Sequence, residues 1–298
     1  MNQDVLKWKL EGNYFNYNKN NIFYLQKGDG LNLLILHGYP FNSFEWKEAI
    51  TELSISYKVT VFDFLGMGFS DKPKNHKYSF EEYCEIVNAL LKELKIYETH
   101  ILSHDLGVSI AQELIAREDE NKNTFKIQSS AFVNGSLFID AYKPRFIQKI
   151  LSNSPTIIGK TISKLLTKKM VNNSVKSVFG PFTKPSEDFL ELQWEIINYN
   201  DGKEITYRIG RLVFEKYKFL NRWVKSMQET SIPMCYICGP FDPNSGEHMV
   251  KRYDELIPKP KIYIQNRFIG HWPHIEDVKS FLDSFYNFQS NYVNHLKK

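Results

Sequence analysis

Short apolar runs alternate with amphipathic stretches along most of the chain. The apolar runs, at residues 33–36, 59–62, 100–102, 130–133, 235–237 and 262–264, have the composition of buried strands. Around them, apolar residues recur at helical spacing and predict helices over about residues 43–53, 79–94, 106–117 and 277–289. Strands that alternate with helices favour a mostly parallel sheet that is covered on both faces. We therefore predict an α/β fold.

Two regions depart from this alternation. Residues 8–17 and 22–26 flank an Asn-rich segment at 18–21, and together they predict an N-terminal hairpin. From about residue 136 to residue 230 strand patterns are absent and amphipathic helical spacing dominates, and the alternation resumes at residue 232. We interpret residues 136–230 as a helical cap inserted into one α/β core, which then comprises residues 1–135 and 231–298.

Composition and charge narrow the class of protein. The 298 residues are 42% hydrophobic, which is enough for a packed core, and the net charge is only +4. So small an excess gives no reason to expect a nucleic-acid partner. The excess is local, however, because residues 141–186 contain nine basic residues and no Asp or Glu. A solvated helix face is the simpler interpretation of this segment, and peripheral contact with an anionic membrane is the alternative.

Cysteine content and hydropathy bear on cofactors and compartment. The chain has three cysteines, and no run approaches the roughly 18 apolar residues of a membrane span. Cys235 and Cys238 lie in a strand pattern, where residues three apart face opposite sides, and no second Cys/His pair follows at zinc-ligand spacing. The N-terminal residues lack the apolar core of a signal peptide. We expect a soluble cytoplasmic protein without metal or other cofactor, whose oligomeric state the sequence does not define.

Residues that follow predicted strands are informative because α/β folds bind ligands at the carboxyl ends of their strands. Residues 103–107, SHDLG, have the form small-x-nucleophile-x-small between a strand and a helix. This pattern is typical of a nucleophile elbow, with Asp105 in the nucleophile position. The N-terminus of the following helix favours an ionised carboxylate there. The alternative is that Asp105 only caps the helix.

Two further loops supply partners for Asp105. Asp242 follows the strand at 235–237, and His271 follows the strand at 262–264. Nucleophile, acid and histidine therefore occur in the chain order of an α/β-hydrolase triad. We prefer His271 to His274 as the base, because His271 comes directly after the glycine at position 270.

The segment HGYP at residues 37–40 follows the first core strand. A glycine turn at this point predicts an oxyanion hole formed by the backbone N–H groups of Tyr39 and Leu106. We expect Asp63, in the glycine loop that follows the second core strand, to shape the pocket wall. This loop lacks the third glycine of a dinucleotide-binding fingerprint, which disfavours a Rossmann oxidoreductase.

Together, HGYP, DFLGMGFSDKP, SHDLG, GPFDP and GHWPHIED resemble the α/β-hydrolase branch that contains epoxide hydrolases and haloalkane dehalogenases. The resemblance extends from about residue 31 to residue 288. It implies that Asp105 attacks an electrophilic carbon to form an alkyl-enzyme ester, and that His271, oriented by Asp242, activates the water that hydrolyses this ester. It also implies an apolar small-molecule substrate and no cofactor.

Departures from each subfamily bear on the substrate. The dehalogenases of this branch carry a Trp after the nucleophile and usually an Asn after the first His-Gly, whereas this chain has Leu106 and Tyr39. Trp194 or Trp223 of the predicted cap could partly substitute as halide donors. An aromatic residue after His-Gly is similar to epoxide hydrolases, and that resemblance implies a cap tyrosine as the proton donor to the opening epoxide. The predicted cap offers four tyrosines, which are Tyr142, Tyr199, Tyr207 and Tyr217.

Among these tyrosines we prefer Tyr217, because it precedes the aromatic residues at positions 219 and 223. We therefore expect epoxide hydrolysis. Hydrolysis of haloalkanes or small esters is an alternative activity. A catalytically idle hydrolase fold that binds a ligand or another protein is the alternative outside enzymes.

Overall fold

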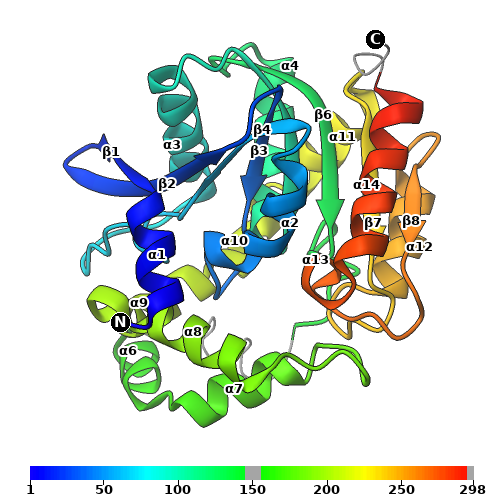
Figure 1. Ribbon diagram of the computed structural model, residues 1–298. Helices are drawn as coiled ribbons and strands as arrows, with labels where there is room; N and C mark the ends of the chain where they lie inside the picture. Colours follow the sequence, from blue (N-terminus) through cyan, green and yellow to red (C-terminus); the bar gives the residue numbers. More distant parts are fainter. Residues whose placement is uncertain (145–155, 294–298) are drawn as a thin grey trace.

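The computed structural model describes residues 1–144 and 156–293. One eight-stranded sheet forms its centre, with the strand order β1-β2-β4-β3-β5-β6-β7-β8 (Figure 1). The strands are β1 Asn13–Tyr17, β2 Asn20–Lys27, β3 Leu31–Leu36, β4 Tyr57–Phe62, β5 Glu98–His104, β6 Lys126–Val133, β7 Met234–Cys238 and β8 Ile262–Ile264. The pairs β1/β2 and β2/β4 are antiparallel and all other neighbours are parallel. The α/β class predicted from the sequence is confirmed.

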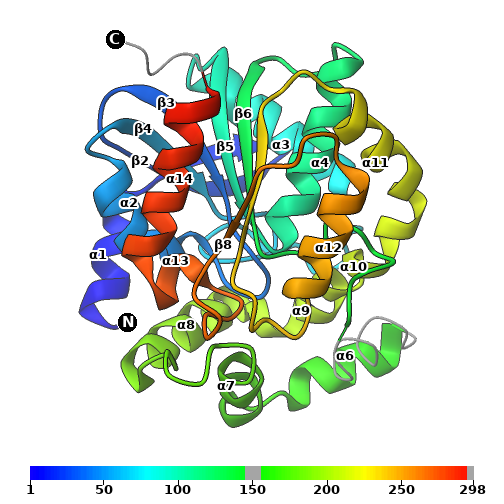
Figure 2. The same ribbon diagram turned by 90° about the vertical axis from the view of Figure 1, so that its right-hand side faces the viewer.

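Helices cover both faces of the sheet (Figure 2). One face carries α1 Gln3–Glu11, α2 Lys47–Leu53 and α14 Val278–Tyr292, and the other carries α3 Phe80–Glu93, α4 Leu106–Asp119, α11 Leu220–Glu229 and α12 Glu247–Leu256. Successive residues of β3 alternate between the two cores, since Leu33 and Ile35 pack on one side and Leu34 and Leu36 on the other. Burial on both faces explains why the strand reads as a continuous apolar run.

The start of the predicted N-terminal hairpin is wrong. Residues 8–11 belong to helix α1, because Val5 and Trp8 lie one turn apart and are both buried, and Trp8 packs edge-on against Phe44 with ring centroids 5.6 Å apart. The hairpin itself is present as β1 and β2. Its turn contains only Asn18 and Lys19, which both have positive φ, as a two-residue hairpin turn requires.

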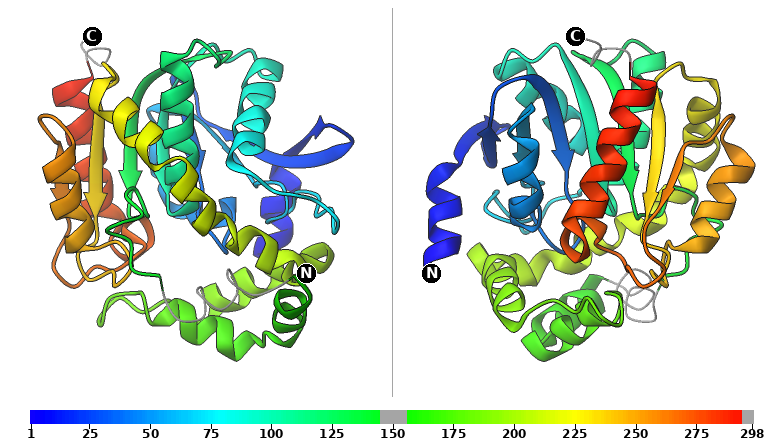
Figure 3. Two further views of the ribbon diagram at one scale, coloured as in Figure 1. Left: turned by 180° about the vertical axis from the view of Figure 1, so that it is seen from behind. Right: turned by 45° about the vertical axis from the view of Figure 1, so that its right-hand side comes forward.

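Between β6 and β7 the described chain forms helices and no strand. The helices other than α11 are α6 Thr156–Leu165, α7 Lys168–Lys176, α8 Glu187–Asn198, η2 Tyr199–Asp201, α9 Gly202–Gly210, α10 Leu212–Glu215 and η3 Lys216–Lys218. We refer to residues 136–230 as the helical insertion. Figure 3 shows its green helices beyond the end of the sheet, on the side where β6 ends. These helices of the insertion therefore lie over the carboxyl ends of the parallel strands, whereas α11 packs on a face of the sheet.

The basic segment of the insertion is partly neutralised within the fold. Lys168 forms an ion pair with Glu191, and Lys176 forms one with Glu187, so acids of α8 compensate bases of α7. Two of the nine basic residues, at positions 145 and 149, lie outside the described residues. These pairs favour the interpretation as a solvated face, and contact with a membrane surface stays a prediction. Across residues 1–144 and 156–293, no helix has the length and hydropathy of a membrane span.

Candidate active site

Asp105 occupies the sharp turn between β5 and α4. Its φ is +48°, which non-glycine residues rarely adopt and which is a typical sign of strain at a functional position. The start of α4 comes so close to the neighbouring strand β3 that a Cβ on Gly107 would lie 2.3 Å from the carbonyl oxygen of Leu36. The Asp105 side chain makes no capping hydrogen bond to α4. Its Oδ1 instead accepts a hydrogen bond of 2.9 Å from the Tyr39 N–H, so helix capping does not explain this aspartate.

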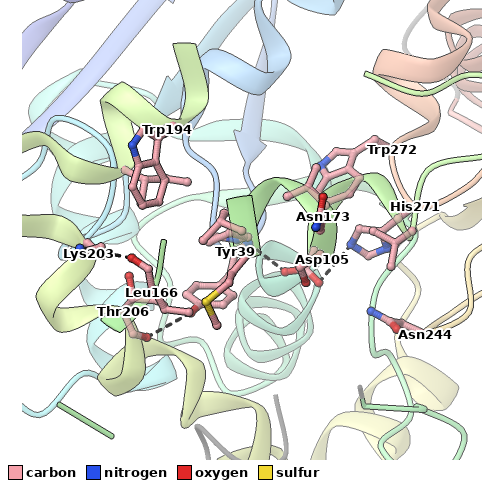
Figure 4. Close-up of a pocket in the computed structure, with 17 residues that line it drawn as sticks. Tyr39, Asp105, Leu166, Asn173, Trp194, Lys203, Thr206, Asn244, His271 and Trp272 are labelled. Carbon is pink, nitrogen blue, oxygen red and sulfur yellow. Dashed lines mark hydrogen bonds and ion pairs between the residues drawn. The ribbon is translucent and has the colours of Figure 1, made fainter. Parts of the chain in front are cut away.

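The loops after β7 and β8 bring Asp242 and His271 to Asp105. The Nδ1 atom of His271 lies 2.7 Å from Asp242 Oδ2, and its Nε2 atom lies 3.4 Å from Asp105 Oδ2. Asp242 also accepts hydrogen bonds from the Ser245 hydroxyl at 2.6 Å and the Asn134 side-chain amide at 3.1 Å. Figure 4 shows His271 facing the Asp105 carboxylate. The three residues predicted as a triad are thus joined through one imidazole ring.

The two carboxylates determine the protonation state of His271. Burial alone would lower the pKa of His271, but the charges of Asp242 and Asp105 and their hydrogen bonds raise it to about 10. Burial would raise the pKa of Asp105, yet its hydrogen bond to His271 and the nearby positive charge hold that pKa well below the usual range. The pKa of Asp242 is likewise lowered against the effect of burial, chiefly by His271. The free site therefore holds an imidazolium between two ionised carboxylates at neutral pH.

The predicted oxyanion-hole residues flank Asp105. Tyr39 follows β3, and Leu106 is the first residue of α4. The Tyr39 hydroxyl donates to the carbonyl oxygen of Thr206 in α9 at 3.2 Å, which ties this turn to the helical insertion. Burial raises the pKa of the Tyr39 hydroxyl, so it stays protonated as a donor. The backbone N–H of Tyr39 contacts Oδ1 of the Asp105 carboxylate.

Glu45 is a buried residue that the sequence analysis did not single out. It lies in η1 Ser43–Trp46, where it is packed among aromatic side chains. Its Oε1 accepts hydrogen bonds from the Gly38 N–H at 3.0 Å and contacts His104 Nδ1 at 3.2 Å, and its Oε2 accepts from the Trp272 indole N–H at 3.1 Å. His104 in turn contacts the carbonyl oxygen of His271 at 2.9 Å. Glu45 therefore connects the oxyanion turn, the elbow and the histidine loop.

His274 lies behind this network and away from the cavity. It stacks on Trp46 with ring centroids 3.8 Å apart, and burial lowers its pKa well below the usual value. Among the described residues, Glu45, His104 and His274 are the group whose ligand atoms are close enough to suggest a metal, all within 4.8 Å. The Glu45 oxygens already accept hydrogen bonds from the Gly38 N–H and the Trp272 indole N–H, and all three side chains are buried. The donor set is therefore better explained as a hydrogen-bond network that positions loops.

A cavity of about 490 Å³ lies over Asp105 and His271 (Figure 4). The core contributes mostly polar and aromatic residues to its wall, and the insertion contributes mostly apolar ones. The insertion residues that line it are Leu166, Met170, Val171, Asn173, Ser174, Val175, Val178, Trp194, Ile197, Lys203 and Thr206. The cavity size and this lining suit a small apolar molecule that would lie beside Asp105 and His271.

The prediction of Tyr217 as a proton donor is wrong. Its side chain is 60% exposed and stacks on Phe214, and none of the four candidate tyrosines lines the cavity. In the three-residue turn η3, neighbouring side chains point about 120° apart, so only one of two adjacent residues can face inwards. Here the inward residue is Lys216, which is 2% exposed and donates a hydrogen bond to the Ser136 hydroxyl. Because charged residues are rarely buried, only the structure singles out this lysine.

The indole donors suggested for a halide are also mostly engaged elsewhere. The Trp223 indole N–H donates to Glu113 of α4 at 2.7 Å, and Trp223 does not line the cavity. The Trp272 indole lines the cavity, but its N–H is used by Glu45. Of the two tryptophans suggested as halide donors, Trp194 is the one that lines the cavity (Figure 4).

Residues 32–278 match the family described as alpha/beta hydrolase fold, and the chain belongs to this family. The mesoderm-specific transcript homolog protein of Bos taurus is 35% identical over 298 residues, covering 96% of this chain and 88% of that protein. The predicted resemblance to the α/β-hydrolase family is confirmed. The similarity to mesoderm-specific transcript proteins covers 96% of this chain.

Solved structures show the same fold at low sequence identity. The epoxide hydrolase CorEH has a TM-score of 0.77 at 17% identity, covering 94% of this chain and 98% of that one. The haloalkane dehalogenase DatA from Agrobacterium tumefaciens C58 has a TM-score of 0.77 at 15% identity, covering 92% and 95%. Both substrate classes thus occur on this fold, so the choice between them has to be argued from the site.

Proposed function

We propose that this protein is a hydrolase that uses Asp105 as a nucleophile against an electrophilic carbon, with epoxides as its substrates. The proposal rests on two contacts of the His271 imidazole beside the cavity. Its Nδ1 atom lies 2.7 Å from Asp242 Oδ2, and its Nε2 atom lies 3.4 Å from Asp105 Oδ2. A carboxylate can attack carbon at neutral pH without prior deprotonation, because its pKa is held low. We further propose that the helical insertion acts as a cap over this site.

In the first step an Asp105 oxygen forms a bond to the substrate carbon while the carbon–oxygen bond of the epoxide breaks. The product is an ester between Asp105 and the ring-opened substrate. Ester formation removes the negative charge of Asp105, which is one of the two charges that raise the pKa of His271. His271 then loses its proton more readily, and this proton balances the one that the oxygen released by ring opening takes up. His271 becomes a neutral base, oriented by Asp242.

In the second step His271 takes a proton from water, and the hydroxide attacks the ester carbonyl. The N–H groups of Tyr39 and Leu106 stabilise the tetrahedral oxyanion in this step. When the intermediate collapses, the imidazolium returns a proton to the departing alkoxide and the Asp105 carboxyl returns its proton to His271. One water is consumed, the epoxide becomes a diol, and the enzyme returns to its starting state.

A dehalogenase is the second candidate, and the presence of Trp194 in the cavity wall favours it. Epoxides are preferred because Leu106, next to the nucleophile, has no side-chain donor for a halide and because the other nearby indole N–H groups are used by Glu45 and Glu113. Substrate panels separate the two candidates: halide release from short haloalkanes, without diol formation from epoxides, would favour the dehalogenase.

The test of the proposal is to trap the ester. His271→Gln removes the base but leaves Asp105, so we expect a styrene-oxide-like epoxide to add its mass to the Asp105 peptide. The double variant with Asp105→Ala is the matched control and should remain unmodified. An adduct on another residue, or equal turnover of wild type and Asp105→Ala, would contradict Asp105 as the nucleophile.

A further inference from the structure

Asn244 is a buried polar residue of the cavity wall that the steps above do not use. It is 4% exposed, and it lines the cavity together with Asp105 and His271. Within residues 1–144 and 156–293 its side chain forms no hydrogen bond, and its Oδ1 atom is buried without a partner. Buried side-chain amides are hydrogen-bonded in the large majority of cases. An unpaired amide in a cavity wall therefore points to a partner that the protein itself does not supply.

The backbone of Asn244 fixes this amide next to the triad. Its N–H donates to Asp242 Oδ1 at 2.8 Å, and its carbonyl oxygen accepts from the Lys143 N–H at 3.1 Å and contacts His248 Nε2 at 2.9 Å. The other oxygen of the same Asp242 carboxylate lies 2.7 Å from His271 Nδ1. Figure 4 shows Asn244 beside His271 at one end of the cavity. Asn244 and the catalytic imidazole are thus held by the two oxygens of one carboxylate.

The fold does not require an amide at this position. All three contacts above use backbone atoms of Asn244, and a leucine of similar size could make them equally well. In the wall that the insertion contributes, polar side chains are bonded within the protein: the Thr206 hydroxyl donates to the Gly202 carbonyl oxygen at 3.2 Å, and the Lys203 ammonium donates to the Leu166 carbonyl oxygen at 3.3 Å. Mostly apolar pockets use a few polar groups to orient their ligands. The amide of Asn244 is such a group at the catalytic end.

We propose that the Asn244 amide binds a hydroxyl group that the substrate carries next to the reacting carbon. The inference rests on the proposed function and narrows its substrate class to epoxides with a hydroxyl-bearing substituent. A hydroxyl can accept a hydrogen bond from Nδ2 and can donate one to Oδ1, so it fits either half of the amide. A hydrocarbon substituent would displace water from the amide and leave it unpaired, which disfavours the hydrocarbon analogue. Asn244 selects and orients the substrate and takes no part in proton transfer.

Two styrene-oxide-like epoxides that differ at one position test the proposal. One carries a hydroxymethyl group on the second ring carbon, and the other carries an ethyl group of similar size in its place. The kcat/KM for diol formation is measured for both substrates with wild type and with Asn244→Leu. Comparing the hydroxymethyl-to-ethyl ratio between the two proteins cancels the difference in intrinsic reactivity. We expect Asn244→Leu to lower this ratio on the order of 10-fold, as for loss of one hydrogen bond, through slower reaction of the hydroxymethyl substrate.

Three controls separate this role from a structural one. Asn244→Ser keeps a donor and an acceptor and should retain part of the ratio, whereas Thr206→Val should retain all of it, because that hydroxyl is already bonded to Gly202. In the His271→Gln background, Asn244→Leu should leave the rate of Asp105 ester formation from the ethyl epoxide unchanged. Thermal unfolding should show Asn244→Leu to be at least as stable as wild type, since the side chain has no hydrogen bond within the described protein to lose.

The outcomes distinguish the two proposals. An unchanged ratio in Asn244→Leu would overturn the role of Asn244 and leave Asp105 as the nucleophile. Equal slowing with both epoxides would also overturn it, because the effect would not depend on the hydroxyl. Failure of the His271→Gln parent to form an Asp105 ester with either epoxide would overturn the proposed function, and the role of Asn244 with it.

Discussion

The α/β core and the helical insertion contribute to the site in different ways. In the core, charged groups are held by several directed contacts each: Asp242 accepts three side-chain hydrogen bonds, and Glu45 connects three loops. The insertion presents mainly apolar surface, and the Tyr39–Thr206 hydrogen bond is a polar link between the two regions at the cavity. Under the proposed function, the core would carry out the bond-making chemistry and the insertion would determine which substrates fit.

The largest effect should come from removing the nucleophile in the core. Asp105→Ala should lower epoxide turnover on the order of 10⁴-fold or more, because residues that act as one catalytic unit fail together. Steady-state diol formation measures this loss, and a thermal melt confirms that the variant is folded. Activity close to that of wild type would place the chemistry elsewhere.

A second prediction concerns the charge balance around His271. Asp105→Asn removes one of the two negative charges, as the ester does, so the pKa of His271 should fall from about 10. In wild type the imidazole should stay protonated through neutral pH and lose its proton only on the alkaline side. Nitrogen-15 NMR of the histidine ring, recorded against pH in both proteins, measures the difference. An unchanged titration would mean that the Asp105 charge does not control the base.

A third prediction weakens the core network without touching the triad. Glu45→Gln replaces one acceptor oxygen with an NH2 group that faces a donor from Gly38 or Trp272. A buried donor left without a partner lowers the free energy of unfolding by about 1–3 kcal/mol. Urea unfolding measures this value, and we expect the turnover number to fall more than the apparent substrate affinity because the loops that hold His271 shift. Wild-type stability would show that the network is not needed for the fold.

Changes in the insertion should have smaller and different effects. Leu166→Ala removes part of the apolar wall and enlarges the cavity. One methylene more or less in an apolar pocket changes the discrimination between two substrates by roughly 1–3 kcal/mol. We expect a shift in preference towards bulkier epoxides, with the alkylation chemistry retained. Rate constants for a graded epoxide series measure the shift. A uniform loss of turnover for every substrate would contradict the division between the two regions.

The smallest expected effect concerns the outer face of the insertion. Leu165 is exposed beside the cavity-lining Leu166, and Lys164 and Lys169 are exposed nearby in the sequence. If this surface contacts an anionic membrane, cosedimentation with phosphatidylserine vesicles should exceed that with phosphatidylcholine vesicles, and Lys164→Glu with Lys169→Glu should reduce it. Equal sedimentation with both lipids would leave the solvated-face interpretation.

The difference between the core and the insertion also explains how much of the fold and of the site the sequence predicts. Strand ends and loop motifs follow from apolar runs and glycine turns, so the neighbourhood of Asp105, Asp242 and His271 is predictable from local patterns. The N-terminal helix is not predicted because Trp8 and Leu10 alternate with polar residues, as they would in a strand. Only the packing of Trp8 against Phe44 decides between helix and strand.

Positions in the insertion were harder to predict because a short helical turn decides which neighbour faces inwards. Tyr217 has the chemistry expected of a donor, yet η3 directs it to solvent and buries Lys216 instead. Glu45 was missed for a related reason. A charged residue in a predicted helix suggests an exposed position, and its three partners come from loops distant in sequence.

The central claim, that Asp105 forms a covalent ester with substrate, is tested most directly by turnover in water enriched in oxygen-18. Hydrolysis at the ester carbonyl transfers a water oxygen to the Asp105 carboxylate, so many turnovers should label the Asp105 peptide by mass spectrometry. Enzyme incubated without epoxide is the control and should remain unlabelled. Diol formation without label in Asp105 would mean that water attacks the substrate directly, and it would contradict the account.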